Sequence, residues 1–159
     1  MKKARIAIVL LLGICLISGL ACSFFLETDV EFAGINMEPT IMDGQVCTVE
    51  ENAYFVLDPK RGEVVLFIIN TESFLSRVIG LPGETITIED GAVYIDGTIL
   101  DEPYLPDGTI TDSDTEEFKV PDNYYFVMGD NRTQSLDSQT GGSILLDIIE
   151  AKVLNCKFK

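Results

Sequence analysis

Histidine and tryptophan are absent from this chain of 159 residues, and basic residues are few. Without histidine, a catalytic triad with an imidazole base is excluded, and so is any zinc site that needs an imidazole ligand. The chain has 11 Lys and Arg against 26 Asp and Glu, which gives a formal net charge of −15. Because a phosphate backbone is bound by a basic surface, this balance excludes nucleic acid as an expected partner.

Cysteine is also sparse, with four residues at positions 15, 22, 47 and 156. They are too scattered to form a Cys-x-x-Cys metal or redox pair, so we expect no metal and no cofactor. Cys47 and Cys156 fall in predicted strands of a domain expected to face an oxidising compartment. A disulfide between them and two buried free thiols are both compatible with the sequence.

Charge is missing altogether from Ile6 to Leu26, a run of 21 residues. A helix of this length would be about 31 Å long, close to the thickness of the hydrocarbon core of a bilayer. Basic residues precede the run and acidic residues follow it, which predicts a cytoplasmic N-terminus and an outward-facing domain. We therefore predict a cytoplasmic basic tail over 1–5, a transmembrane signal anchor over 6–26 and an extracellular domain over 27–159.

Two other interpretations of this apolar run stay open. One is a cleaved secretory signal peptide, although the run is longer than the usual apolar core of about 7–15 residues. The other is a lipoprotein signal in which Cys22 is acylated. The sequence Gly19-Leu20-Ala21-Cys22 has the small residue before the cysteine, but it lacks the apolar residue expected three positions earlier.

Beyond the apolar run, the pattern changes to period-two alternation and short apolar stretches, which predicts a mainly β, antiparallel domain shaped as a folded-over sheet or small barrel. Asp90-Gly91 and Asp96-Gly97 predict two-residue hairpin turns, and Leu81-Pro82-Gly83 predicts a type II turn. A polar, acidic stretch over 105–117 predicts a mobile surface loop. The segment 147–150 predicts a short helical turn. The strands are expected at 45–49, 63–69, 85–89, 92–95, 98–100, 124–128 and 151–154.

Four segments in this order resemble the conserved boxes of type I signal peptidases of Gram-positive bacteria. The resemblance implies an all-β peptidase fold, on a single anchor, at the outer face of the membrane. It also implies binding of an extended peptide by strand addition, and cleavage by a Ser nucleophile with a Lys base. The segments are Gly34-Ile-Asn-Met-Glu-Pro-Thr40, Arg61-Gly-Glu-Val-Val-Leu-Phe67, Arg77-Val-Ile-Gly-Leu-Pro-Gly-Glu84 and Gly129-Asp-Asn-Arg-Thr-Gln-Ser-Leu-Asp-Ser138.

The chain departs from this family at both reactive positions. The residue before Met-x-Pro-Thr, where the family has its nucleophilic Ser, is Asn36, and the residue before Arg-Val-x-Gly-Leu-Pro-Gly, where the family has its Lys, is Ser76. An amide cannot be activated into an acyl-enzyme nucleophile, and a hydroxyl does not accept a proton near neutral pH. We therefore expect no intact catalytic residue.

The last box departs from the family more mildly. It ends Asp137-Ser138-Gln139 where the family has Asp-Ser-Arg. This change removes an expected ion-pair partner of Asp137 or Asp130, for which Arg132 could compensate. Ser135 and Ser138 match positions that support the Lys in the family. The residues expected to form or support a peptide groove are Gly34, Met37, Pro39, Arg77, Asp130, Arg132, Ser135 and Asp137.

These observations predict a membrane-anchored pseudoenzyme of the signal peptidase type, whose groove binds an extended segment of an exported protein. Within this family, homologues without the dyad from Gram-positive pilus gene clusters are needed for pilus assembly alongside sortases. The resemblance thus implies a pilin-like segment as partner, with a sortase or an active signal peptidase nearby. Two alternatives stay open. One is an active signal peptidase with non-standard catalytic groups, and the other is an inert paralogue whose anchor pairs with an active peptidase or with another copy of itself.

Overall fold

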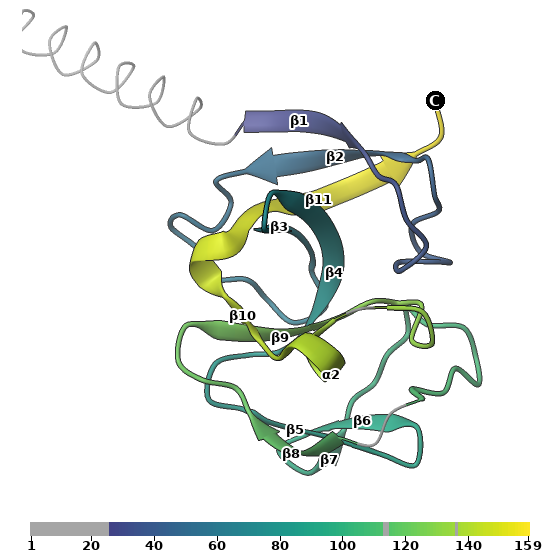
Figure 1. Cartoon of the computed structure of the whole chain (residues 1–159), viewed down its shortest axis with the longest axis vertical. Coiled ribbons are helices and arrows are strands. Elements are labelled where there is room, and N and C mark those ends of the chain that lie inside the picture. The colour runs from purple at the N-terminus through teal and green to yellow at the C-terminus, as the bar shows by residue number, and fades with distance from the viewer. Residues whose placement is uncertain (1–25, 113–114, 136) are drawn as a thin grey trace, which may run out of the picture.

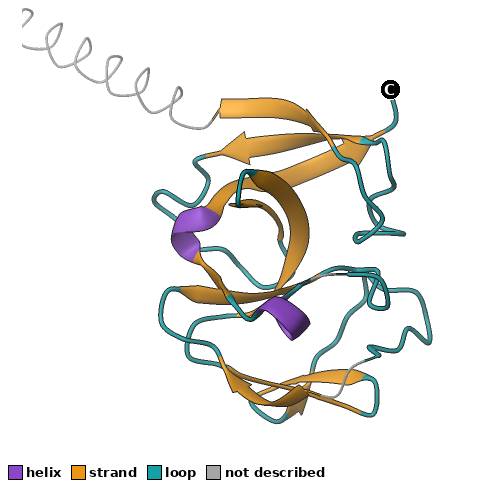
Figure 2. Cartoon of the chain, viewed as in Figure 1, coloured by secondary structure: helices purple, strands orange, loops and turns teal. Residues whose placement is uncertain are grey.

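The computed structural model describes residues 26–112, 115–135 and 137–159 (Figure 1). Within these residues, eleven strands form two antiparallel sheets, which confirms the predicted mainly β class (Figure 2). The larger sheet has the order β1-β2-β11-β3-β4-β9-β10. Its strands are β1 (Leu26–Glu31), β2 (Val46–Glu51), β11 (Ile149–Lys157), β3 (Val64–Ile69), β4 (Glu72–Gly80), β9 (Tyr124–Met128) and β10 (Ile144–Leu145).

The smaller sheet lies at the other end of the molecule, below β9 in the view of Figure 1. Its order is β7-β6-β5-β8, with β7 (Thr98–Ile99), β6 (Ala92–Ile95), β5 (Thr85–Glu89) and β8 (Thr115–Lys119). Two short helical turns, α2 (Ser138–Gly141) and the 3₁₀ turn η1 (Leu146–Ile148), flank β10. η1 overlaps the helical turn predicted over 147–150.

The core lies on both faces of β3, which explains why this strand is a continuous apolar run. Val64 and Leu66 pack into one cluster with Met37, whereas Val65 and Phe67 pack into another on the opposite face. Since side chains alternate across a strand, both faces of β3 are buried over Val64–Phe67 and neither face needs polar residues there. This central position fixes β4 beside β3, and β4 carries the candidate site.

A third apolar cluster joins the two sheets. Ile79 of β4 and Phe126 of β9 pack in it against Ile86 of β5. Gly80 is required at this junction, because a Cβ atom there would lie 2.5 Å from Cδ1 of Ile86. The smaller sheet therefore packs directly on the strands that carry the candidate site.

The predicted turns are confirmed. Asp90 and Gly91 both have positive φ, of 51° and 76°, as a type I′ hairpin turn requires, and Asp96 and Gly97 repeat the pattern with 49° and 76°. At the predicted type II turn, Gly83 has φ of 84°.

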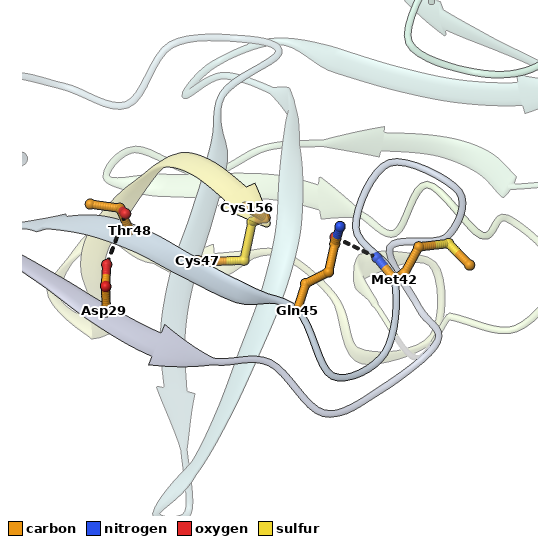
Figure 3. The surroundings of a disulfide bond; sticks show 6 residues. All are labelled: Asp29, Met42, Gln45, Cys47, Thr48 and Cys156. Atoms are coloured by element: carbon orange, nitrogen blue, oxygen red, sulfur yellow. Dashed lines mark hydrogen bonds between the residues drawn. A yellow bond between two sulfur atoms is a disulfide. The ribbon is translucent and has the colours of Figure 1, made fainter. Parts of the chain in front are cut away.

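Cys47 and Cys156 form a disulfide across the directly paired strands β2 and β11 (Figure 3). The sequence was compatible with a disulfide or with two free thiols, and the structure has the disulfide. Cys47 is buried, and the bond ties the C-terminal strand to β2.

Four strands of the structure, β1, β4, β8 and β10, were not predicted from the sequence. β1 begins at Leu26, which the sequence assigned to the end of the anchor, and β4 was not predicted at all. β8 begins at Thr115, inside the stretch predicted to be a mobile loop over 105–117. Thr111 of that stretch is buried, and its backbone N–H donates to the carbonyl oxygen of Gly91 at 3.0 Å.

The predicted tail and the predicted anchor up to residue 25, together with Cys15 and Cys22, lie outside the described residues. Within the described part of the chain, no helix is both long and apolar enough to cross a membrane. The anchor therefore stays a prediction from the sequence.

Candidate functional site

The structure brings Asn36 and Ser76 together. Asn36 lies in the turn that follows β1, and its Nδ2 donates to the carbonyl oxygen of Leu75 at 2.6 Å. Ser76 is buried in β4, where it pairs with Val65 of β3. The amide and the hydroxyl that occupy the two reactive positions thus lie on neighbouring segments, as the sequence motifs predicted.

The loop after β9 closes over the same point. Gly129 packs so tightly that a Cβ atom there would lie 2.4 Å from the carbonyl oxygen of Asn36 and 2.3 Å from Oγ of Ser135. The backbone N–H of Asn131 donates to the Asn36 carbonyl at 3.0 Å. Only glycine fits this close approach, so Gly129 is a packing requirement of the site.

Ser135 Oγ is the single buried side-chain polar atom without a hydrogen-bond partner among the residues that the structure describes. Buried hydroxyl groups are normally paired, and leaving one unpaired costs free energy. Ser135 was predicted to support a lysine, and the residue at the lysine position is Ser76. The unpaired hydroxyl of Ser135 is therefore consistent with the absence of a lysine amine at position 76.

None of the five lysines in the described residues is buried. Lys60, Lys119, Lys157 and Lys159 are exposed, and Lys152 is half-buried in an ion pair with Glu63 at 2.7 Å. A lysine becomes a general base near neutral pH only when burial lowers its pKa. The described part of the chain therefore offers no amine for that role.

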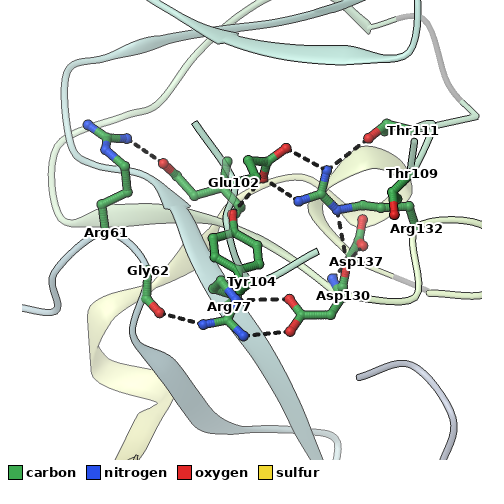
Figure 4. A network of polar contacts seen from close by, with 12 residues as sticks. Arg61, Gly62, Arg77, Glu102, Tyr104, Thr109, Thr111, Asp130, Arg132 and Asp137 are labelled. Carbon is green, nitrogen blue, oxygen red and sulfur yellow. Dashed lines mark hydrogen bonds and ion pairs between the residues drawn. The ribbon is translucent and has the colours of Figure 1, made fainter. Parts of the chain in front are cut away.

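Next to this position lies a fully paired framework (Figure 4). Arg77 donates to both carboxylate oxygens of Asp130, at 2.9 and 2.5 Å, and both side chains are buried. A third hydrogen bond, of 2.7 Å, joins Arg77 to the carbonyl oxygen of Gly62. The ring of Tyr104 covers the guanidinium at 4.0 Å, an arrangement that favours the cation.

Arg132 serves a different purpose from the one the sequence suggested. It makes an ion pair with Glu102 and donates to Thr111 Oγ1 at 2.8 Å, so it fastens the long 100–112 segment to the β9 loop (Figure 4). Burial lowers the pKa of Arg132, but the hydrogen bonds to Glu102 outweigh this and raise the pKa above its usual value. Arg132 was expected to replace the missing ion-pair partner of Asp137 or Asp130. This expectation is wrong, because the guanidinium of Arg132 forms its ion pair with Glu102.

Asp137 is satisfied without an arginine. Its Oδ2 accepts from the backbone N–H of Gly129 at 2.9 Å, and its Oδ1 accepts from the N–H of Gln139 at 3.0 Å, which caps α2. The Gln139 side chain adds a hydrogen bond to the same carboxylate at 3.2 Å. Asp130 also has its partner in Arg77, so neither carboxylate is left unpaired by the loss of the family's arginine.

Two adjoining hollows run along the edge of β4, and we call them together the β4 groove. The smaller one, of about 160 Å³, is lined by residues of 30–33, by Leu75 and by the buried Cys47. The larger one, of about 410 Å³, is lined by 32–36, 72–74 and Gln134. Asn36 therefore lines the larger of the two hollows.

The groove follows a strand edge that is partly free. The residues Glu72–Arg77 of β4 pair with β3, but the pairing of β4 with β9 begins only at Arg77. Among the described residues, the other edge of Glu72–Ser76 therefore has no strand beside it. A free edge next to a groove is the arrangement by which an extended peptide is added as a strand.

The remaining predicted residues divide between the groove and the core. Gly34 lines the groove with φ of 148°. Met37, which could belong to the core or line a groove, is completely buried in the core cluster with Leu66. Pro39 is exposed in the turn after Asn36 rather than in a groove wall.

Sequence reasoning missed the groove residues Phe32, Ser73, Phe74 and Gln134. Their signal was weak, because the start of β4 is polar and no strand was predicted there. Metal ligands are not gathered in this region, and no cluster of three acidic or cysteine side chains suited to a metal occurs among the described residues.

A family model described as signal peptidase, peptidase S26, matches residues 4–156 of the chain. The chain belongs to the signal peptidase family. It is 40% identical over 116 residues to a signal peptidase I of Bacillus amyloliquefaciens, a match that covers 68% of this chain and 63% of that relative. It is 33% identical over 154 residues to a signal peptidase I of Bacillus caldolyticus, covering 89% of this chain and 84% of that protein.

A solved structure supports the same assignment. The crystal structure of a signal peptidase I from Enterococcus faecalis matches with a TM-score of 0.53 and 32% identity, over 63% of this chain and 99% of that chain. The mainly β, antiparallel fold is therefore that of signal peptidase I.

Proposed function

We propose that this protein is a membrane-anchored member of the signal peptidase family that binds an extended segment of an exported protein and does not cleave it. The observation that carries the proposal is the pair at positions 36 and 76. An amide and a hydroxyl occupy the positions at which the family has its nucleophile and its base. Because the members of a catalytic group act as a unit, losing either one costs several powers of ten in rate.

The surroundings of the pair support the loss of chemistry without loss of the fold. No described lysine is buried, and Ser135 Oγ has no partner. The side chain of Asn36 is itself engaged, because its Nδ2 donates to the Leu75 carbonyl oxygen. That bond bridges the two walls of the β4 groove where a nucleophile would have to reach a substrate.

Binding of an extended peptide needs neither a nucleophile nor a base. Strand addition uses backbone N–H and carbonyl groups, and the free edge of Glu72–Ser76 supplies them. The walls beside this edge are small or apolar at Ala33, Gly34 and Phe74, which favours a segment with small side chains. We infer that the partner is an exported protein with such a segment, a pilin-like subunit being one case.

The apolar run over 6–26 gives the proposed location. As a signal anchor it would place the β domain on the outer face of the cell membrane, where exported proteins emerge. A sortase or an active signal peptidase at the same membrane would then act on the bound protein, and this chain would assist assembly.

Binding is tested by site-specific crosslinking of the full chain in its native membrane. Ala33 is exposed and lines both hollows, so Ala33→Arg fills the groove without disturbing the core. Ile99→Arg, at an exposed position of the smaller sheet, is the matched control. We expect crosslinks from the groove to an exported protein that Ala33→Arg abolishes and Ile99→Arg preserves. Crosslinks that both variants preserve would contradict binding in the groove.

The family relatives raise one competing function, because they are named signal peptidase I. An active peptidase with non-standard groups predicts that a preprotein loses its signal peptide when this protein alone is added. That cleavage, in a preparation free of other peptidases, would overturn the proposal.

A further inference from the structure

A second pocket lies on the other face of the strand edge that borders the β4 groove. It has a volume of about 320 Å³ and lies between the paired strands β3 and β4 and the segment formed by α2, β10 and η1. Phe67 and Phe74, which pair across β3 and β4 and whose ring centroids lie 5.7 Å apart, belong to one wall. We call it the Phe74 pocket, and strand addition to the β4 groove alone does not account for it.

The outer wall of the Phe74 pocket has no side chain over two positions. Gly141 and Gly142 both line the pocket, and a Cβ atom at either position would meet no packed neighbour within 4 Å. Gly142 has φ of 77°, a conformation that favours glycine, whereas Gly141 has no positive φ. The backbone therefore does not require glycine at position 141, and its missing side chain leaves space beside the pocket.

The buried polar side chains that line the pocket are already hydrogen-bonded within the protein. The two carboxylate oxygens of Asp137 accept from the backbone N–H groups of Gly129 and Gln139. Ser138 Oγ accepts from the backbone N–H of Val127 at 2.9 Å. A charged or polar ligand group would lose its hydration against groups that already have partners, so the pocket suits an apolar side chain.

Strand alternation connects the Phe74 pocket with the β4 groove. Leu75 packs in the cluster with Leu66 and lines the smaller hollow of the groove, whereas Phe74 packs against the opposite cluster with Phe67. A segment added along the free edge of Glu72–Ser76 would likewise direct successive side chains to opposite faces. Every second side chain would enter the β4 groove, and those between them would face the Phe74 pocket.

We propose that the Phe74 pocket is a second subsite for the added segment and takes a large aliphatic side chain. The inference rests on the strand addition of the proposed function and names the class of segment that is bound. Small side chains toward the β4 groove alternate in it with Leu, Ile or Val toward Phe74. The volume of about 320 Å³ is at the lower end of the range for ligand sites, which suits a side chain rather than a folded element.

Peptide binding to the full chain in lipid nanodiscs tests the subsite. One fluorescent peptide contains Ala-Leu-Ala-Leu-Ala and a second contains five alanines, each with a lysine at both ends for solubility. Ile69→Arg places a charge at the pocket, because Ile69 lines it and is 42% exposed. Ile68→Arg is the matched control, since Ile68 is 37% exposed and its side chain points to the opposite face of β3.

We expect the unaltered protein to bind the alternating peptide roughly tenfold more tightly than the alanine peptide, because burial of a leucine side chain contributes about that factor. Ile69→Arg should remove this preference without weakening the alanine peptide, and Ile68→Arg should preserve it. A preference that Ile69→Arg leaves intact would overturn the subsite.

The same peptides separate the subsite from the proposed function. If the unaltered protein binds both peptides equally and Ala33→Arg abolishes both, the subsite is wrong and strand addition stands. If neither peptide binds, strand addition is wrong and the subsite falls with it.

A photoreactive diazirine analogue at the two leucine positions gives a second measurement that needs no variant. Mass spectrometry should locate its crosslinks at Phe74 or within 140–145. Crosslinks confined to 30–33 would place the leucine side chains in the β4 groove and would overturn the subsite.

Discussion

The framework around the site and the reacting position at its centre differ in how well their polar groups are paired. In the framework, Arg77 and Asp130 share two hydrogen bonds, and Asp137 accepts from Gly129. At the reacting position, Ser135 Oγ is buried without a partner. The architecture is that of a signal peptidase, and the proposed loss of its chemistry concerns only the centre of the site.

The comparison also shows which residues hold the groove open. Asp130, Asn131 and Gly129 belong to one turn that contacts the backbone of Asn36, and Arg77 fixes that turn to β4. The framework therefore positions the groove walls whether or not a nucleophile is present. Breaking the framework should disturb the fold, whereas changing the reacting position should disturb it little.

The largest effect is expected from the framework. Arg77→Leu leaves the Asp130 carboxylate buried and unpaired, which should lower the free energy of unfolding by about 3–5 kcal/mol. The control is Lys159→Met, which removes an exposed ion pair with Glu31 and should cost less than about 1 kcal/mol. Urea unfolding of both variants measures the difference, and equal losses would contradict the buried framework.

The second largest effect on stability is expected from removal of the disulfide. Removing it with Cys47→Ala and Cys156→Ala frees a loop whose ends are 109 residues apart. We expect a loss of about 2–4 kcal/mol, because the crosslink restricts the unfolded chain. Thermal unfolding with and without a reductant provides the measurement, and a midpoint that the reductant leaves unchanged would show that the bond does not form.

A matched serine pair sharpens the contrast between the framework and the reacting position. Ser138 Oγ accepts from the backbone N–H of Val127 at 2.9 Å, so Ser138→Ala should destabilise by about 1–3 kcal/mol. Ser135→Ala removes an unpaired hydroxyl and should be neutral or stabilising. Chemical denaturation of the two variants should therefore give opposite signs or a clear gap. A similar loss from both would mean that Ser135 has a partner after all.

The smallest effect concerns pH. Burial raises the pKa of the Glu63 carboxyl, but hydrogen bonds from Lys152, from the backbone of Lys60 and from Tyr54 outweigh it and lower the pKa below 4.5. Since the folded pKa lies below the unfolded one, Glu63 stabilises the fold above about pH 4.5, and this is lost as the pH falls through the folded pKa.

Comparison with Glu63→Gln isolates this contribution. The difference in unfolding free energy between the two proteins should be about 1 kcal/mol or less at pH 7 and should shrink below pH 4.5. A difference that grows as the pH falls would show that the pKa is raised instead.

Much of the fold could be predicted from the sequence, and the failures have physical reasons. β5, β6 and β9 begin and end where the alternating or apolar pattern predicted. β1 and β4 were missed, and both begin with polar side chains along a partly exposed edge. Such strands carry little apolar period, since pairing with a neighbouring strand holds them in place.

The site was predictable in part. The motifs located Asn36 and Ser76, and in the structure Asn36 donates to the carbonyl oxygen of Leu75, the residue before Ser76. The partner of Arg77 is 53 residues away in sequence, so only the folded sheet reveals it. Arg132 was assigned the wrong partner for the same reason, because Glu102 reaches it from a segment whose course no local pattern predicts.

The most direct test of the central claim is a preprotein cleavage assay with the full chain in detergent. It compares the protein as it stands, the single variants Asn36→Ser and Ser76→Lys, and the two changes combined. We predict that only the combined variant removes a signal peptide, because the framework and the groove are intact and only the reacting pair is missing. Cleavage by the unaltered protein would contradict the account, and so would an inactive combined variant.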